Sequence, residues 1–258
     1  MSKSNLDLSK EFSGLRALVT GGSRGIGGAI AQRLIDGGAK VAVTARSEHE
    51  QTPEDAAFIA GDLRTVEGIK KIAKEALKVL GGIDLLVNNA GAARVHLPGS
   101  SAISDEEWLD SLNINLLAVV RMTNELLPAL LQSKSAAIVN IGAVPGNAAP
   151  APLIHYCAAK AAMNTYTRSL SAELAPKKIR VNVVTPGGVV TPGGDAVRKT
   201  ITDAMGIPPE ALLTKIPLGV FGQPEDLSEF VAHVLSPTRG RWITGQNFYV
   251  DGGMSGAV

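Results

Sequence analysis

The stretch from residue 15 to residue 45 constrains the fold of this chain more than any other. Residues 15–20 form a continuous apolar run, which is typical of a parallel strand buried on both faces. The run leads into a glycine-rich turn at residues 20–27 and then into a helical pattern that ends at Gly37 and Gly38. A second strand is expected at Lys40–Ala45. Strand, glycine turn, helix and strand in this order predict a βαβ unit that binds a nucleotide.

The glycines of the turn have separate physical roles. Gly21 lets the chain fold sharply where the strand ends, and Gly25 leaves room for a pyrophosphate at the helix N-terminus. Gly27 allows the helix to pack closely on the strand. Because the turn lies between a strand and a helix, the sequence predicts that it binds the phosphates of a dinucleotide.

The residues after the second strand favour NADP(H) over NAD. An NAD site usually carries a carboxylate there, to bind the ribose 2′-hydroxyl. This chain has Arg46 at that position, and the next carboxylate is Glu48. Arg46 and Arg24 could instead pair with a 2′-phosphate, although both could also be ordinary surface charges.

Strands and helices alternate through the rest of the chain, which predicts an α/β fold with a doubly wound parallel seven-stranded sheet. A length of 258 residues suits one domain. We expect a loose, flexible leader at residues 1–12 and a single domain at 13–258, with a mobile lid at 191–217. Further strands are expected at 56–60, 83–87, 136–141, 179–184 and 246–250, and helices at 66–80, 104–131, 155–174 and 224–235.

Several polar or small residues follow the expected strands, at the sheet edge where such folds bind ligands. Asp62 could accept a hydrogen bond from an adenine amino group or could cap a helix. Asn88 and Asn89 could contact a ligand or could bridge backbone segments of the sheet. The sequence leaves both alternatives open for each position.

Tyr156 and Lys160 lie four residues apart in an expected helix, so their side chains share one face. An ammonium group that close favours a phenolate and would lower the pKa of the tyrosine, making it a general acid or base. The alternative is a structural pair, with the tyrosine in the core and the lysine in solvent.

Five signatures occur in order along the chain: the glycine turn, Asn88-Asn89-Ala90-Gly91, Asn115, Tyr156-x-x-x-Lys160, and Pro186-Gly187 with Thr191. With these, residues 15–253 resemble the short-chain dehydrogenase/reductase family, in its single-domain branch, and are similar to 3-oxoacyl-carrier-protein reductases. The resemblance implies a Rossmann fold and a homotetramer. It also implies hydride transfer between a nicotinamide cofactor and a small-molecule carbonyl or alcohol substrate.

The resemblance also implies roles for individual residues. Tyr156 would donate the proton, and Lys160 would lower the pKa of Tyr156 and bind the nicotinamide ribose. Asn115 would hold a water that links Lys160 to solvent. The backbone at Val189 and the hydroxyl of Thr191 would fix the nicotinamide carboxamide. The remaining expected cofactor contacts are Gly21, Ser23, Arg24, Gly25, Ile26, Gly27, Arg46, Asp62, Leu63, Asn89, Ala90, Gly91, Pro186 and Gly187.

One residue of the family pattern is missing. The serine that normally hydrogen-bonds the substrate oxygen falls on Ala143, thirteen residues before Tyr156. The chain could be an engineered Ser→Ala variant, or a natural protein in which Asn147 or His155 supplies the donor. His155 also has a bland interpretation as a surface residue at the start of a helix. Two other functions stay open: an NADP-binding scaffold or regulator, and a non-redox acid–base enzyme that uses Tyr156.

Charge and composition narrow the partners and the setting. A formal net charge of +1 without a basic stripe argues against a nucleic-acid or membrane partner. The single Cys157 excludes an internal disulfide and a zinc cluster of cysteines, and we expect no metal. The N-terminus lacks the apolar segment of a signal peptide, so we expect a cytoplasmic protein.

The expected homotetramer is supported by apolar excess on two helices. The helix at 108–131 is hydrophobic beyond the stripe that one sheet face can cover, and 156–174 is rich in small residues. Paired across a two-fold axis they would form a four-helix dimer contact, and the strand at 242–250 would make a second contact. The loop at 143–154, with Val189 and Val190, suggests a mostly apolar substrate.

Overall fold

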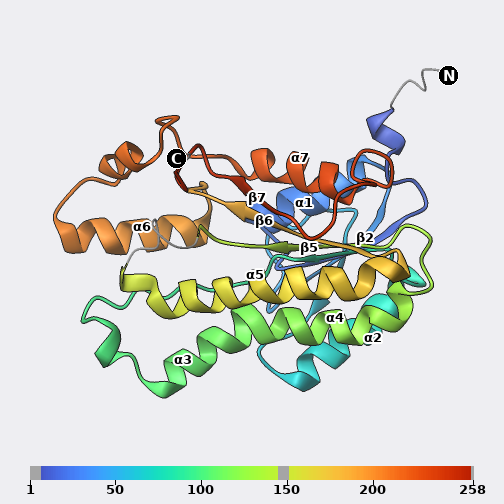
Figure 1. The fold of residues 1–258 in the computed structure, drawn as a ribbon, viewed down its shortest axis with the longest axis horizontal. Coiled ribbons are helices and arrows are strands. Elements are labelled where there is room, and N and C mark those ends of the chain that lie inside the picture. Colours follow the sequence, from blue (N-terminus) through green and yellow to red (C-terminus); the bar gives the residue numbers. More distant parts are fainter. Residues whose placement is uncertain (1–6, 145–150, 257–258) are drawn as a thin grey trace.

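The computed structural model describes residues 7–144 and 151–256. In them, seven parallel strands form one sheet in the order β3-β2-β1-β4-β5-β6-β7 (Figure 1). The predicted doubly wound seven-stranded sheet is therefore confirmed. The strands are β1 Arg16–Thr20, β2 Lys40–Ala45, β3 Ala57–Ala60, β4 Leu85–Asn88, β5 Ala137–Ile141, β6 Arg180–Pro186 and β7 Asn247–Val250.

Helices cover both faces of the sheet. On one face lie α2 (Val66–Leu80), α4 (Ala118–Leu130) and α5 (Ile154–Leu174), with α3 (Asp105–Leu112) leading into α4. On the other face lie α1 (Gly25–Asp36) and α7 (Pro224–Leu235) (Figure 1). In the described part of the chain, no helix combines the length and the apolar character that crossing a bilayer requires.

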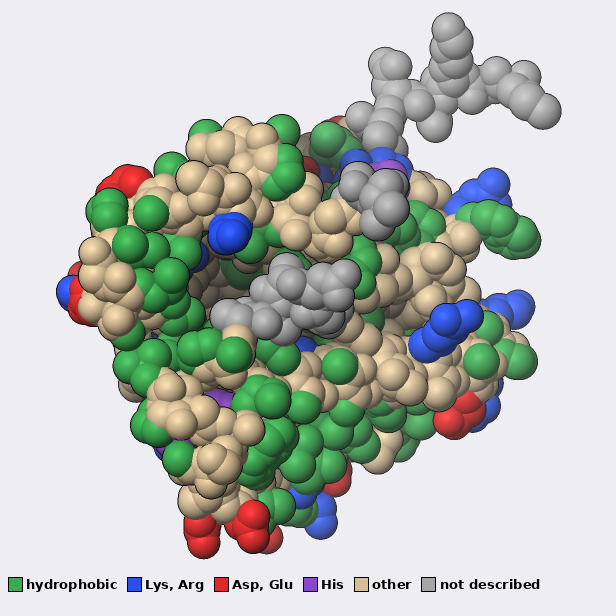
Figure 2. Space-filling model, turned by 60° about the vertical axis from the view of Figure 1, so that its left-hand side comes forward, with side chains coloured by type: hydrophobic (Ala, Val, Ile, Leu, Met, Phe, Trp, Pro, Cys, Tyr) green, Lys and Arg blue, Asp and Glu red, His purple; other side chains and the backbone are tan. Residues whose placement is uncertain are grey.

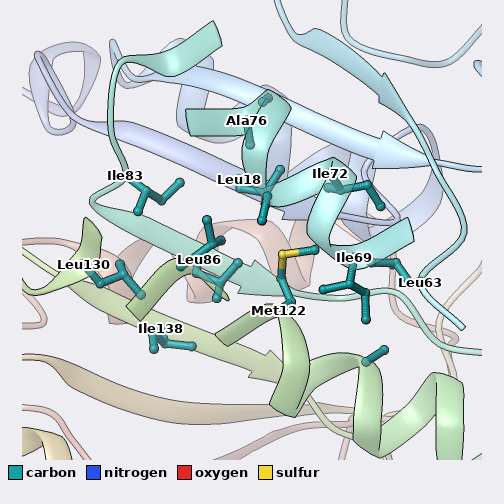
Figure 3. Close-up of a cluster of buried hydrophobic side chains, with 14 of the residues drawn as sticks. Leu18, Leu63, Ile69, Ile72, Ala76, Ile83, Leu86, Met122, Leu130 and Ile138 are labelled. Carbon is teal, nitrogen blue, oxygen red and sulfur yellow. The ribbon is translucent and has the colours of Figure 1, made fainter. Parts of the chain in front are cut away.

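The central strands are apolar on both sides because each side faces a helix layer. Leu18 of β1 points into a cluster with Ile72 of α2 and Met122 of α4, all fully buried (Figure 3). The next residue, Val19, belongs to a second cluster, on the side of α1 and α7. Burial of one such aliphatic side chain contributes about 1.5–3 kcal/mol, so the two clusters together fix the register of the sheet.

The strand order reverses next to β1, which pairs with β2 on one side and with β4 on the other. In open α/β sheets, ligands bind in the crevice outside the carboxyl ends of the strands at such a reversal. The chain leaves β1 through the glycine turn, and it leaves β4 through Asn89, Ala90 and Gly91. The topology therefore brings these two segments to one crevice.

The expected leader at residues 1–12 is wrong at its C-terminal end. Phe12 is fully buried in the cluster beside α1 and α7. The side chain of Glu11 is 1% exposed and forms ion pairs with Arg33 and Arg239. Residues 1–6 lie outside the described part of the chain. The ordered unit therefore begins before residue 13, because an apolar ring and a paired carboxylate anchor the segment.

Two expected helical regions differ from the structure. The helix at 104–131 is interrupted by a π-helical turn at Asn113–Leu117, between α3 and α4. The segment at 191–217, expected to be a mobile lid, contains α6 (Pro192–Met205) and a 3-10 helix at Pro209–Lys215. Pro192 suits the first turn of α6, where its missing N–H would have no helical partner. In Figure 1, α6 lies beside the sheet rather than over a face of it.

Candidate active site

The glycine turn presents an open helix N-terminus at the crevice. Gly21 and Gly25 have φ angles of 64° and 56°, which favour glycine because other residues are strained there. Helix α1 begins at Gly25, and Arg24 before it makes no side-chain capping hydrogen bond. The first N–H groups of α1 are thus free of a side-chain cap, and such an N-terminus attracts anions.

Close packing behind the turn depends on Gly27. A Cβ atom on Gly27 would collide with the Asn89 side chain and with the backbone of Gly21. Asn89 Nδ2 donates to the carbonyl oxygens of Thr20 and Gly21 at 3.0 and 3.1 Å. The side chain of Asn89 therefore bridges the end of β4 to the turn, which supports the backbone-bridging alternative. Asn88 likewise bonds within the sheet, donating to Asn140 Oδ1 at 2.8 Å.

Arg24 and Arg46 follow β1 and β2 at the same edge of the sheet. Thr20 and Thr44 are paired in the parallel ladder of β1 and β2, so the residues after both strands lie at neighbouring strand ends. Both arginines are exposed. Two guanidinium groups at this edge give the crevice a positive end.

Asp62 and Leu63 are the two residues expected to contact the cofactor near its adenine. Asp62 Oδ1 accepts from the backbone N–H of Arg64 at 2.9 Å, so this carboxylate holds its own turn while its side chain stays 45% exposed. Leu63 is 6% exposed and packs in the core beside α2. The side chain of Leu63 therefore belongs to the core, and a cofactor contact there would have to come from its backbone.

Lys160 and Tyr156 leave the N-terminal half of α5. Lys160 is 3% exposed, and its Nζ donates to the carbonyl oxygen of Ile141, the last residue of β5, at 2.7 Å. Burial lowers the pKa of this ammonium from 10.5 to about 8, because the charged form is poorly solvated. The helix thus fixes the lysine against the sheet edge.

The expected acidification of Tyr156 by Lys160 is contradicted. The pKa of the half-buried Tyr156 is raised above 10, first because burial disfavours the phenolate and second because of the charge on Cys157. The ammonium of Lys160 is engaged by the Ile141 carbonyl. Tyr156 is therefore a protonated phenol at neutral pH in this structure.

Asn115 lies in the π-helical turn and is fully buried. Its Oδ1 accepts from the backbone N–H of Ala92 at 3.0 Å, and its Nδ2 donates to the carbonyl of Ala92 at 2.9 Å. A Cβ atom on Gly91 would lie 2.9 Å from Asn115 Oδ1 and 3.4 Å from Lys160 Nζ. Because Gly91 has no side chain, the amide of Asn115 and the ammonium of Lys160 can both lie close to its backbone. The amide itself is occupied by the loop after β4.

Ala143 lies two residues after the end of β5 and is half-buried, so the structure leaves a methyl group where the family pattern has a hydroxyl. Of the two suggested substitutes, Asn147 lies outside the described residues. His155 is 3% exposed and packs edge-on against Trp108 of α3, with ring centres 6.0 Å apart. The interpretation of His155 as a surface residue is wrong, because the start of α5 is covered by α3.

The loop after β6 completes the crevice. Gly187 donates to the carbonyl of Val250 at 3.1 Å, and a Cβ atom on it would strike Asp251. Thr191 Oγ1 accepts from the N–H of Gly194 at 3.1 Å and so caps α6. A Cβ atom on Gly25 would lie 3.3 Å from Thr191. The loop after β6 therefore meets the glycine turn.

Sequence reasoning missed the side chains that hold this loop. Arg198 of α6 donates to the carbonyl of Val189 at 2.9 Å and lies 4.5 Å from the ring centre of Phe221. Met254 Sδ accepts from the N–H of Gly188 at 3.1 Å. All of these contacts except Arg198 to Val189 join residues far apart in the chain. The sequence carries no local signal for them.

Comparisons with known proteins point to one family. A family model described as short chain dehydrogenase matches residues 16–202. The 3-oxoacyl-[acyl-carrier-protein] reductase FabG of Vibrio harveyi is 36% identical over 249 residues, covering 94% of this chain and 98% of that protein. The FabG of Staphylococcus aureus strain Mu50 is 35% identical over 248 residues, covering 92% of this chain and 97% of that protein.

Two solved structures have the same fold. A short chain dehydrogenase from Burkholderia cenocepacia in complex with NADP has a TM-score of 0.83 and 30% identity, covering 95% of this chain and 99% of that one. The 3-ketoacyl-(acyl-carrier-protein) reductase from Brucella melitensis complexed with NADH has a TM-score of 0.83 and 28% identity, with the same coverages. With the family model matching more than half of its length, this chain belongs to the short-chain dehydrogenase family.

Proposed function

We propose that this protein is an NADPH-dependent oxidoreductase that transfers a hydride between the nicotinamide and a ketone or secondary alcohol. The observation that carries the proposal is the position of Lys160. Its Nζ is fixed on the last carbonyl of β5 and lies beside Gly91 and Asn115, at the same sheet edge as the glycine turn. Tyr156 precedes it by one helical turn.

The residues at this edge fit a nicotinamide dinucleotide. The uncapped N-terminus of α1 and the positive φ of Gly25 suit the pyrophosphate, and a Cβ there would close the approach to Thr191. Lys160 would bind the nicotinamide ribose, and the loop at Val189 and Thr191 would hold the carboxamide. When bound, the cofactor supplies or accepts the hydride.

NADP(H) is favoured over NAD by the two arginines. Related structures contain either cofactor, with NADP in the Burkholderia cenocepacia protein and NADH in the Brucella melitensis reductase. The choice in this chain therefore depends on its own residues. Arg24 and Arg46 are both exposed at neighbouring strand ends, where a 2′-phosphate can accept from two guanidinium groups.

Tyr156 is the proton donor in the direction of reduction. Its raised pKa keeps the phenol protonated at neutral pH, which is the form that a general acid requires. Ala143 removes the second donor to the substrate oxygen. The loss of one such donor typically lowers turnover by about 10²–10³-fold, so we expect slow reduction.

The substrate is proposed to be mostly apolar. Large hydrophobic side chains are exposed on the loop after β4 and in the region of α6: Leu97, Val190, Met205, Leu218 and Val220. Figure 2 shows hydrophobic side chains gathered round a hollow on this part of the surface, with charged groups mainly at the margin. Such a surface suits a ketone with an aliphatic or aromatic body.

A panel of apolar ketones tests the proposal, with NADPH oxidation measured for this chain and for Ala143→Ser. We expect slow turnover in the first and about 10²–10³-fold faster turnover in the second. Ala143 also favours a second candidate function, an NADP-binding protein without useful catalysis. Tight NADPH binding with no turnover in either protein would support that candidate and remove the reductase.

The proposed assembly is a homotetramer built from a helix-bundle dimer. Around α3, α4 and α5 the chain exposes Leu109, Leu131 and Ile154. Near β7 it exposes Trp242 and Tyr249, with Trp242 92% exposed. Exposed apolar residues in two separate regions suit two contacts between copies, which is what a tetramer with dihedral symmetry requires.

A further inference from the structure

A cavity of about 310 Å³ lies beside the expected adenosine end of the crevice. Its volume is within the range of small-molecule sites. Its described lining includes neither Tyr156 nor Lys160, although it includes Ala92, which is hydrogen-bonded to Asn115. The lining residues come from the ends of β2 and β3, the loop after β4, and helices α3 and α5: Arg46, Arg64, Ala92, Ala93, Arg94, Glu107, Asp110, Ser111 and His155.

His155 is a buried polar side chain in the lining of the cavity. It is 3% exposed, and its Nδ1 has no hydrogen-bond partner among residues 7–144 and 151–256. Buried side-chain nitrogens nearly always have a partner from protein, water or ligand. Burial lowers the pKa of this imidazole. The charge of Glu107 acts in the opposite direction, His96 and Arg94 lower the pKa further, and the ring is neutral at neutral pH. A neutral imidazole suits a hydroxyl or carbonyl group rather than a second charge.

The charges that line the cavity nearly cancel. Arg64 Nε donates to Asp110 Oδ1 at 2.7 Å, and Arg94 Nη1 donates to Glu107 Oε1 at 2.9 Å. Arg46 is the one lining arginine that forms no ion pair within the described residues. An exposed guanidinium group binds a carboxylate or a phosphate through two parallel hydrogen bonds. The unmatched charge therefore fits a single anionic group.

From the cavity, the unpaired Arg46 and the unpartnered His155, we propose that this cavity binds a small hydroxy- or oxo-carboxylate. The carboxylate pairs with Arg46, and the hydroxyl or carbonyl group reaches the imidazole of His155. Arg46 is also the proposed partner of the cofactor 2′-phosphate, so the two anions compete for one guanidinium group. Binding of the carboxylate therefore weakens NADP(H) more than NAD.

The probe is 3-hydroxybutyrate, added to the full chain without cofactor. Butyrate lacks its hydroxyl group, and 3-hydroxybutyramide lacks its charge. The chain has four histidines, so proton NMR can follow the ring signal of His155, which is assigned by its loss in His155→Gln. We expect a saturable shift of that signal with 3-hydroxybutyrate, and at least about tenfold weaker binding of either matched compound.

Replacement of two alanines by leucine, one in the cavity and one outside it, locates the site. Ala93→Leu fills the cavity without changing any charge, and we expect at least about tenfold weaker binding of the probe. Ala102→Leu is the matched control on an exposed position that does not line the cavity, and its affinity should equal that of the unmodified chain. An unshifted His155 signal, or equal affinity in both variants, overturns the inference. Titration of NADP in the same samples reports separately on the proposed function.

Discussion

At the scale of single residues, the pair on α5 behaves differently from the isolated sequence pattern. Spacing places Tyr156 and Lys160 on one helix face, as predicted. Their pKa values depend on burial, which lowers that of Lys160 and raises that of Tyr156. These values suit a cycle in which the protonated Tyr156 donates its proton to the substrate. Lys160, with a pKa of about 8, then helps to return a proton to Tyr156.

Replacement of Tyr156 by phenylalanine tests the proton donor. We expect Tyr156→Phe to lower the turnover of ketone reduction by about 10²–10⁴-fold, because general acid catalysis is lost. The Kd for NADPH, measured by fluorescence titration, should change little. Unchanged turnover would show that Tyr156 donates no proton.

The buried Lys160 should affect stability in a defined pH window. Its folded pKa of about 8 is below the ordinary 10.5, so the unfolded chain binds more protons between these values. Stability relative to Lys160→Met should therefore rise as pH increases from 8 toward 10.5, by up to roughly 3 kcal/mol. Urea unfolding of both proteins across that range measures the difference. A difference independent of pH would contradict the lowered pKa.

Arg46 and Arg24 should decide cofactor choice. Loss of a hydrogen bond to a charged group costs about 1.5–3 kcal/mol, so Arg46→Ala and Arg24→Ala should each raise the Kd for NADPH by about ten- to hundredfold. The Kd for NADH should stay the same. Arg241→Ala, at another exposed position, is the matched control. Equal losses for both cofactors would argue against 2′-phosphate binding.

At the scale of elements, the Glu11 carboxylate helps the buried Phe12 ring to hold the N-terminal segment on the domain. Glu11 accepts from Arg33 Nη2 at 3.1 Å and from Arg239 at 2.6 and 2.8 Å. These contacts join the N-terminal segment to α1 and to the chain after α7. Although burial alone would raise it, the pKa of Glu11 is lowered by hydrogen bonds from Arg239 and other groups.

Glu11→Gln should therefore destabilise the fold. Removal of one partner from a buried ion-pair network typically costs about 3–5 kcal/mol, measured here as the free energy of unfolding in urea. Glu229→Gln is the matched control, because Glu229 pairs with the same Arg33 but is 61% exposed. We expect the control to lose less than about 1 kcal/mol. Equal losses would show that burial of Glu11 contributes nothing.

The wild-type contribution of Glu11 should also depend on pH in a known direction. The lowered pKa means that its stabilisation is present above the ordinary value of 4.5 and is lost as pH falls through the folded value. The difference in unfolding free energy between Glu11 and Glu11→Gln proteins should shrink in acid.

At the scale of the whole molecule, two exposed apolar regions remain in addition to the hydrophobic side chains exposed after β4 and near α6. One includes Leu109, Leu131 and Ile154, and the other includes Trp242 and Tyr249. Sedimentation should show a tetramer. Leu109→Glu, at the first region, should give a smaller species, because it would bury a charge in the helix contact. A monomer at all concentrations for the unmodified chain would contradict the proposed assembly.

The sequence by itself determined the parts of this protein that follow from local periodicity. The glycine spacing predicted a sharp turn after the first strand, where the structure has positive φ angles at Gly21 and Gly25, and the alternation of strands and helices predicted the sheet. Lys40–Ala45, Val66–Leu80 and Pro224–Leu235 were predicted with the observed bounds, because caps and apolar patterns lie within each element.

Only the tertiary structure decided which groups meet across the chain and how strongly water is excluded from them. Burial of Phe12, the clamp of Asn115 on Ala92, and the raised pKa of Tyr156 all depend on such contacts. Desolvation is set by atoms that pack from distant elements. No spacing within one helix encodes it, and the same limit applies to the cavity beside His155.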